Sequence, residues 1–116
     1  NIVEFDFNGL TLKMMSLELH KEVKLESKVK LLVKPSNVII SKNYIENISL
    51  SNQALAKIVA IENGELLSSI SLKIGDTTFE SIITKESSKR LHLQEGNIVN
   101  ILIKASDLAI LRVLHD

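Results

Sequence analysis

The sequence predicts an all-β fold with short helical turns, arranged as small barrels in which one order of elements occurs twice. Short segments with apolar residues at alternate positions recur along the chain, as in residues 3–7 and 10–15. Residues suited to tight turns separate several of these segments. The order strand, strand, short helix, strand, strand then occurs once in each half. That unit is too long for a solenoid repeat and suits a duplicated small barrel.

Nine segments are expected to be strands, because they alternate apolar and polar residues or are rich in Val, Ile and Leu. They are residues 3–7, 10–15, 28–34, 38–41, 55–62, 66–74, 77–84, 98–104 and 108–113. Two more polar stretches, residues 16–23 and 85–91, predict single helical turns. Thr84 is placed to cap the second turn, because its hydroxyl can accept an N–H group of the first helical residues.

Turn chemistry supports these boundaries. An Asn-Gly pair supplies two residues that adopt positive φ, which is the strongest short signal for a hairpin. We therefore expect residues 55–62 and 66–74 to form a hairpin around Asn63 and Gly64. Further tight turns are expected at Asn8-Gly9, Gly75-Asp76 and Glu95-Gly96.

The two halves of the chain resemble each other in sequence. Residues 34–40 (KPSNVII) match residues 104–110 (KASDLAI), and residues 24–27 match residues 93–96. The second half has about one more hairpin arm ahead of the shared part, so the first half begins at what should be its second or third strand. We expect a shortened first repeat at residues 1–43 and a complete second repeat at residues 44–116, with residues 41–50 as a polar linker. The chain also lacks a starting Met, which suits a piece of a longer protein.

Composition narrows the class of protein. Of 116 residues, 45% are hydrophobic, which is enough for a packed core. Fourteen basic and fourteen acidic side chains cancel, so net charge gives no reason to expect nucleic acid or an anionic membrane as a partner.

The absence of cysteine excludes disulfides and thiolate metal sites, and it fits a cytoplasmic location. No apolar run approaches the roughly 20 residues that span a bilayer, and the first residues show no signal-peptide pattern.

No catalytic constellation is visible in the sequence. His20, His92 and His115 are scattered, without the helical spacing that would predict a metal site. The sequence contains no Gly-x-Ser-x-Gly elbow and no phosphate-binding loop. We therefore expect a chain that is not an enzyme, and any ATPase part would lie outside it.

Five lysines between residues 21 and 34 raise the alternative of nucleic-acid binding. Glu22 and Glu26 interleave with these lysines, and aromatic residues make up only 3% of the chain. Barrels that bind single strands stack bases on aromatic side chains. Here Phe5, Phe7 and Phe79 alternate inward and are expected in the core. The pattern disfavours direct binding of nucleic acid.

Four short motifs occur in the order and at the spacing of one known family. They are residues 49–59 (SLSNQALAKIV), 82–84 (IIT), 91–96 (LHLQEG) and 103–108 (IKASDL). Together they resemble the Ser-x-Arg-Asn opening, the Ile-Thr step, the Leu-x-Leu-x-x-Gly turn and the Ile-Lys-Ala-Ser ending of the molybdate-binding Mop (TOBE) domains. Ser51 stands where the family motif has Arg. The resemblance covers residues 49–112 well, and residues 1–41 resemble a divergent, shortened copy.

This resemblance implies a five-stranded OB-like barrel and a site for molybdate or tungstate at contacts between barrels. Such a tetrahedral dianion needs hydroxyl, amide N–H and ammonium donors that converge on it. The implied ligands are Ser49, Ser51, Asn52, Thr84, Lys104, Ala105 and Ser106, with Lys34 and Ser36 in the equivalent places of the first half. Each has a plainer role by itself: residues 49–52 as a solvated linker end, Thr84 as a helix cap, Lys104 as a solvated lysine and Ser106 as the start of a turn.

Three functions follow from these observations. The first is an oxyanion-binding regulatory domain at the C-terminal end of the ATP-binding subunit of a molybdate ABC transporter, in the cytoplasm or at the inner face of the membrane. The second is the sensor part of a molybdate-responsive transcription regulator, attached to a DNA-binding domain. The third is a structural dimerisation module without a ligand. In each case we expect a homodimer or a higher homo-oligomer, because small barrels expose strand edges that proteins usually cover.

Overall fold

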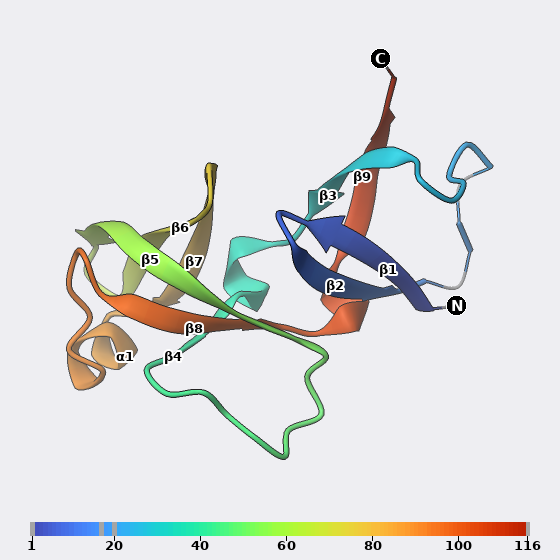
Figure 1. Cartoon of the computed structure of the whole chain (residues 1–116). Helices are drawn as coiled ribbons and strands as arrows, with labels where there is room; N and C mark the ends of the chain where they lie inside the picture. Colours follow the sequence, from blue (N-terminus) through green and yellow to red (C-terminus); the bar gives the residue numbers. More distant parts are fainter. Residues whose placement is uncertain (1, 17, 20, 116) are drawn as a thin grey trace.

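A computed structural model describes residues 2–16, 18, 19 and 21–115, in which strands dominate and helices are short (Figure 1). The first half contains β1 (Ile2–Phe7), β2 (Leu10–Met15), β3 (Lys28–Leu32), the 3-10 helix η1 (Pro35–Asn37) and β4 (Ile39–Ser41). The second half contains β5 (Asn52–Asn63), β6 (Leu67–Ile74), β7 (Thr77–Thr84), α1 (Lys85–Arg90), β8 (Ile98–Ile103), the 3-10 helix η2 (Ala105–Asp107) and β9 (Ala109–Leu114). The prediction of an all-β chain with short helical turns is confirmed.

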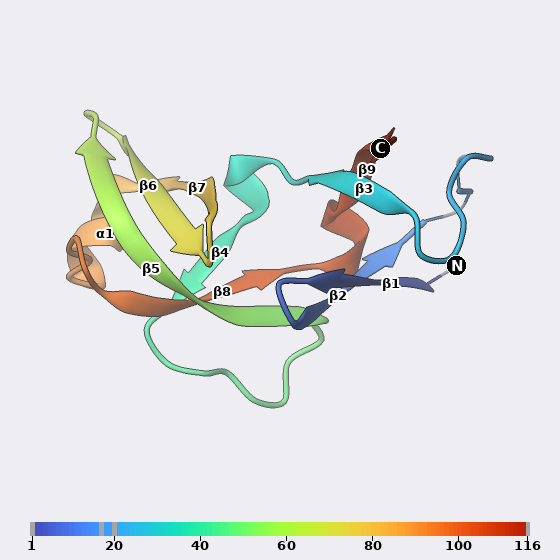
Figure 2. The same cartoon turned by 45° about the horizontal axis from the view of Figure 1, so that its top comes forward.

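A curled antiparallel sheet of five strands, in the order β4-β8-β5-β6-β7, forms the larger barrel (Figure 2). The first part of β5 alternates strictly: Ala54, Ala56 and Ile58 are buried, whereas Leu55 between them is 63% exposed. This alternation follows from the period of two along a strand, which sends successive side chains to opposite faces. The core of the barrel contains fully buried residues from three strands, which are Ile58, Ile70, Leu72 and Val99. An OB-like barrel is thereby confirmed for this part of the chain.

The last strand of each half pairs with a strand of the other half. β4 pairs with β8, with Ile39 opposite Leu102. β9 pairs with β3 in the corresponding register, with Ala109 opposite Leu32. Each barrel therefore draws strands from both sides of residue 43. The division at residues 43 and 44 stays a prediction about repeats in the sequence, not about units that fold separately.

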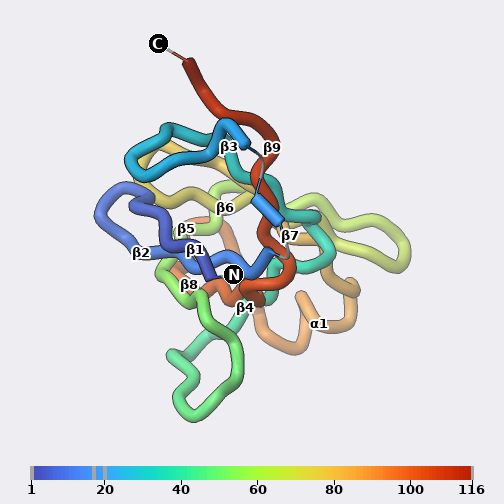
Figure 3. The backbone as a smooth tube through the Cα atoms, turned by 90° about the vertical axis from the view of Figure 1, so that its right-hand side faces the viewer, coloured from blue at the N-terminus to red at the C-terminus, as the bar shows by residue number. Residues whose placement is uncertain are grey.

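The smaller barrel lies at the other end of the molecule, which faces the viewer in Figure 3. It consists of a two-stranded sheet of β1 and β2 and a two-stranded sheet of β3 and β9. Phe5 and Phe79 are half buried against the core cluster, as expected for inward-pointing aromatic residues. Phe7 is also half buried, at the end of β1.

Hydrogen bonds in two equivalent turns correct the alignment of the repeats. In the first turn, the Ser27 N–H donates to the Lys24 carbonyl oxygen at 3.0 Å and the Lys24 N–H donates to Ser27 Oγ at 2.9 Å. In the second, the Asn97 N–H donates to the Gln94 carbonyl oxygen at 3.1 Å and the Gln94 N–H donates to Asn97 Oδ1 at 2.9 Å. Residues 24–27 therefore correspond to residues 94–97. The match to residues 93–96 is wrong by one residue, because a polar side chain at the fourth position closes each turn.

The predicted turns form, but not all with the expected geometry. Asn8 and Gly9 both have positive φ, at 51° and 86°. The hairpin of β5 and β6 also forms, with Asn63 opposite Ser68. Its connection is a three-residue loop, residues 64–66, closed by the Gly64 N–H donating to the Leu67 carbonyl oxygen at 2.8 Å. Neither Asn63 nor Gly64 has positive φ, so the positive φ expected of this pair is wrong.

One of the two predicted helical turns is present. α1 follows Thr84, whose side chain caps it as expected. In residues 16–23 the described positions form bends and turns rather than a helix, while Leu17 and His20 lie outside the described residues. The helices η1 and η2 were not predicted, since three residues are too few to show a helical period. Within the described ranges, no helix is long and apolar enough to cross a membrane.

Candidate functional site

The start of β5 and the end of β8 lie side by side at the junction between the barrels. Asn52 is paired with Ile103 in the antiparallel register of these strands. Ser51 precedes Asn52 and Lys104 follows Ile103, so the register brings Ser51 beside Lys104. Both residues are exposed. Two of the segments predicted to bind the anion therefore converge, although about fifty residues separate them in the sequence.

The residues after β8 turn sharply at this junction. Lys104 is extended, with φ −67° and ψ 142°, and its carbonyl oxygen accepts from the Asp107 N–H at 2.9 Å. This bond forms the short helix η2, which packs against β2. Ala105 is buried, whereas Ser106 is exposed beside it. The turn thus presents the Lys104 ammonium and the Ser106 hydroxyl to solvent on one short segment.

The Asn52 side chain is buried and hydrogen-bonded to the backbone of β2, which its position in the sequence did not indicate. Its side chain is only 2% exposed. Its Oδ1 accepts from the Lys13 N–H at 2.7 Å, and its Nδ2 donates to the Lys13 carbonyl oxygen at 2.8 Å. A direct bond from this amide to an anion would require breaking one of these two hydrogen bonds. Asn52 therefore fixes β2 against β5, and only its backbone is available without such a rearrangement.

These bonds also bring Lys13, an exposed lysine of β2, to the junction. Lys13 was not among the residues singled out in the sequence. A contact between residues 39 positions apart leaves no local pattern from which it could be inferred. Two lysines, Lys13 and Lys104, thus belong to segments that meet beside Ser51.

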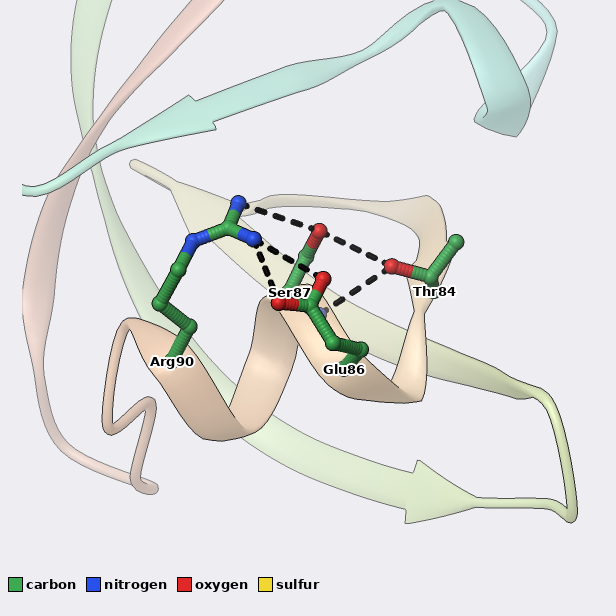
Figure 4. Close-up of polar contacts among 4 residues, drawn as sticks. All are labelled: Thr84, Glu86, Ser87 and Arg90. Carbon is green, nitrogen blue, oxygen red and sulfur yellow. Dashed lines mark hydrogen bonds and ion pairs between the residues drawn. The ribbon is translucent and has the colours of Figure 1, made fainter.

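Thr84 lies elsewhere, at the start of α1 (Figure 4). Its hydroxyl oxygen accepts from the Ser87 N–H at 3.1 Å and its O–H donates to Ser87 Oγ at 2.8 Å. The same helix is closed by an exposed ion pair of Arg90 with Glu86 at 2.6 Å. In Figures 1 and 2, α1 and η2 lie at opposite ends of β8. A single chain therefore does not bring Thr84 together with Lys104 and Ser106.

The equivalent residues of the first half have a related geometry. Lys34 is extended, with φ −70° and ψ 134°, and its carbonyl oxygen accepts from the Asn37 N–H at 2.8 Å. The helix η1 packs against β7, where the Ser81 hydroxyl donates to the Val38 carbonyl oxygen at 2.6 Å. Lys34 and Ser36 are both exposed. Among the described residues, no strand lies beside Lys34 in the way that the start of β5 lies beside Lys104.

The remaining candidate, Ser49, is exposed in the loop between β4 and β5. That loop is held to the sheet through Gln53, whose side chain exchanges two hydrogen bonds of 2.9 Å with the backbone of Ile45. Two grooves on the described surface are lined by none of the predicted ligands. Of the candidate residues, Ser51, Lys104 and Ser106 are exposed at the junction, whereas Thr84, Lys34 and Ser36 lie elsewhere on the surface. In the described part of the chain, no three His, Asp or Glu residues gather as a metal site would require.

The molecule is similar to known proteins in both sequence and structure. No protein-family model matches the chain. The chain is 29% identical over 110 residues to the molybdate/tungstate import ATP-binding protein WtpC of Pyrococcus abyssi (strain GE5 / Orsay). That match covers 95% of this chain and 32% of the relative, so the chain spans about a third of the relative's length.

Two solved structures share the fold. The cytoplasmic molybdate-binding protein ModG, in a crystal form with molybdate bound, superposes with a TM-score of 0.64 and 27% identity, covering 69% of this chain and 58% of ModG. A molybdate-binding protein from Sporomusa ovata superposes with a TM-score of 0.55 and 29% identity, covering 57% of this chain and 98% of that protein.

These relationships also bear on catalysis. The related domains are binding modules, and the ATPase part of WtpC lies outside the matched region. The prediction that this chain is not an enzyme is confirmed on that ground. Together, the curled five-stranded barrel and the similarities in sequence and structure support a Mop/TOBE-type domain.

Proposed function

We propose that this chain binds molybdate or tungstate at the junction where Ser51 lies beside Lys104. The observation that supports the proposal most directly is the register of β5 and β8, which pairs Asn52 with Ile103. By this register Ser51 and Lys104, which are both exposed, would offer a hydroxyl and an ammonium group on the same surface. The two solved structures described above carry molybdate-binding names, and one of them is molybdate-bound.

The proposed donors suit a tetrahedral dianion. Lys104 supplies the charge, and Ser51 and Ser106 supply hydroxyl donors. Lys13 adds a second positive charge on the segment held by Asn52. Charge-assisted hydrogen bonds are about twice as strong as neutral ones, so a few of them can hold a small dianion. Ser49 and the backbone at Asn52 and Ala105 complete the proposed first group of ligands.

A homodimer, or a higher homo-oligomer, is proposed to complete the site. Ser51, Lys104 and Ser106 are exposed at the junction, and α1, which Thr84 caps, lies at the opposite end of β8. A second copy of the chain could bring its own Thr84, or its Lys34 and Ser36, to the exposed junction. A two-fold arrangement is the commonest for such assemblies. It would also cover the exposed apolar side chains of the barrels, such as Leu55 and Ile98, at 63% and 58%.

The proposed setting is the regulatory C-terminal part of the ATP-binding subunit of a molybdate or tungstate transporter, in the cytoplasm. The relative WtpC is an import ATP-binding protein, and this chain matches 32% of its length. The name of ModG describes a cytoplasmic protein. Binding would then report the intracellular oxyanion level to the attached ATPase. A transcription regulator would use the same binding chemistry with a DNA-binding domain in place of the ATPase.

Isothermal titration calorimetry with molybdate, tungstate and sulfate tests the proposal. We expect heat of binding with molybdate or tungstate. In the variant Lys104→Ala the affinity should fall at least about tenfold, because a hydrogen bond to a charged group contributes about 1.5–3 kcal/mol. Lys57→Ala is the matched control, since Lys57 is an exposed lysine at the opposite end of the same strand pair, opposite Ile98.

The outcomes separate the candidate functions. Loss of affinity in Lys104→Ala with unchanged affinity in Lys57→Ala supports the junction site. Equal affinity in both variants removes Lys104 from the site. No heat with any of the three anions, at protein concentrations where the chain is folded and oligomeric, favours a structural dimerisation module instead.

A further inference from the structure

The loop between β4 and β5 is closed at its base by the side chain of Gln53. Its Oε1 accepts from the Ile45 N–H at 2.9 Å, and its Nε2 donates to the Ile45 carbonyl oxygen at 2.9 Å. These two bonds join the second residue of β5 to a loop residue eight positions earlier. Residues 46–52 thus form a closed turn of the chain, and two of the proposed anion ligands, Ser49 and Ser51, lie inside it.

Residues 46–51 have no other polar anchor in the part of the chain that the structure describes. Neither their backbone nor their side chains form a further hydrogen bond or ion pair there. All of them except Leu50 are exposed, and the loop extends away from the body of the molecule in Figures 1 and 3. Segments with few contacts and an exposed backbone open locally at low free energy. The two bonds of Gln53 are therefore the main polar restraint on where Ser49 and Ser51 lie.

Gln53 and Asn52 hold different parts of the molecule from the same strand. Successive side chains of a strand point to opposite faces. The Asn52 amide therefore bonds to Lys13 of β2, whereas the Gln53 amide bonds to the loop on the other face. The strand register also places Ser51 beside Lys104 at this end of β5. Two amides, each with one donor and one acceptor bond, thus fix β2 and the loop on either side of the proposed anion site.

We propose that Gln53 is a positioning residue of the anion site, an inference that rests on the proposed function. Gln53 keeps the loop closed, so that the Ser51 hydroxyl and the neighbouring backbone lie near Lys104 before an anion arrives. It acts through the loop rather than by touching the anion, since its amide oxygen and nitrogen are bonded to the backbone of Ile45. A loop that is ordered in advance loses less conformational entropy on binding, and the affinity is higher for that reason.

Molybdate titration calorimetry of Gln53→Ala tests the proposal, with urea unfolding as the measure of folding. We expect the affinity for molybdate to fall by about fivefold, because only a fraction of the opened loops would present Ser51 correctly. The variant should remain folded, since both bonds of Gln53 lie on the exposed side of the strand. If it does not fold, Gln53→Met, which keeps the length of the side chain without its amide, takes its place.

Ser41→Ala is the matched control. The Ser41 hydroxyl also forms two hydrogen bonds with the loop backbone, donating to the Asn43 carbonyl oxygen at 2.6 Å and accepting from the Asn43 N–H at 3.3 Å. These bonds lie in the same loop but outside the turn that Gln53 closes. Ser41→Ala should therefore keep the affinity of the unmodified chain, and a fall equal to that of Gln53→Ala would contradict the proposal.

A double-mutant cycle separates positioning from a general loss of structure. Ser51→Ala removes the hydroxyl that Gln53 is proposed to position, so in that background Gln53→Ala should lower the affinity by less than about twofold. Ser106 lies on η2, outside the loop, so in the Ser106→Ala background the fall caused by Gln53→Ala should remain about fivefold. The same fall in both backgrounds would show that Gln53 does not act through Ser51.

Hydrogen exchange in the absence of any anion provides an independent measurement. The Ile45 amide, which donates to Gln53, should exchange about tenfold faster in Gln53→Ala than in the unmodified chain. Unchanged exchange at Ile45 would overturn the proposal, and so would faster exchange with unchanged affinity for molybdate, which leaves the proposed function intact. If the unmodified chain gives no heat with molybdate or tungstate, the proposed function fails and the positioning role of Gln53 fails with it.

Discussion

The side-chain amide of Asn52 forms two hydrogen bonds with the backbone of Lys13, a residue 39 positions earlier in the chain. At 2.7 and 2.8 Å, the amide offers β2 one acceptor and one donor, as a neighbouring strand would. It does so from a buried position at the first residue of β5. The two halves are therefore joined at the same point at which Ser51 meets Lys104.

Replacing Asn52 tests how much these hydrogen bonds between β5 and β2 stabilise the fold. Asn52→Ala should lower the free energy of unfolding by about 2–4 kcal/mol, because it leaves the Lys13 N–H and carbonyl without partners in a partly buried position. Gln53→Ala is the matched control. Gln53 forms the same pair of bonds with the backbone of Ile45, but on the exposed side of the strand, so about 0.5 kcal/mol is expected. Urea unfolding measures both. If both variants lost the same free energy of unfolding, burial of the Asn52 hydrogen bonds would add nothing to stability.

The hydroxyl of Ser81 offers a second test of the contact between halves. It is fully buried and donates to the Val38 carbonyl oxygen at 2.6 Å. Ser81→Ala should cost about 1–2 kcal/mol of stability, since a buried carbonyl loses its donor. Ser69→Ala removes a hydroxyl that bonds to Glu80 at 3.1 Å on the exposed face, and its effect should stay within about 0.5 kcal/mol. A chemical denaturation midpoint that is the same for both variants would contradict the expected role of Ser81.

Thr84 can be tested as a cap and as a ligand in one pair of variants. Thr84→Ala should lower stability by about 1 kcal/mol, because the Ser87 N–H loses its acceptor. Thr84→Ser keeps the hydroxyl and should preserve most of that stability. Thermal unfolding measures how much Thr84 stabilises the protein as a helix cap. Molybdate titration of the folded variants measures whether Thr84 contributes to anion binding. A loss of affinity in Thr84→Ala that Thr84→Ser restores would support a contribution to the anion site from a second copy. Unchanged affinity would leave Thr84 as a cap alone.

Ser51 stands where the resembling motif has Arg, and the structure places it beside Lys104. Ser51→Arg adds a planar group of five N–H donors at the proposed site. We expect molybdate affinity to rise by about threefold to tenfold at low salt and to gain less at high salt, where charges are screened. Ser51→Gln, which is long but neutral, is the control and should not raise affinity. Weaker binding by Ser51→Arg would indicate that repulsion from Lys104 and Lys13 outweighs the added donors.

The sequence by itself determined the strand-rich class, most strand positions and the duplicated order of elements. These features are local: alternation with a period of two defines a strand, and residues 34–40 and 104–110 repeat visibly. The cap at Thr84 was equally predictable, because capping involves only residues within one helical turn. The hairpin of β5 and β6 was predictable from its flanking strands, but the φ angles of Asn63 and Gly64 were not.

Only the tertiary structure decided which residues meet. The exchange of β4 and β9 between barrels depends on pairing between strands far apart in the chain, which no local pattern encodes. The same is true of the site: Ser51 and Lys104 meet through a register, Asn52 is occupied by the backbone of Lys13, and Thr84 lies at the other end of β8. A sequence motif specifies residue types and their order. The distance between two motifs is set by long-range strand pairing and by burial of the shared core, and both arise only when the chain folds.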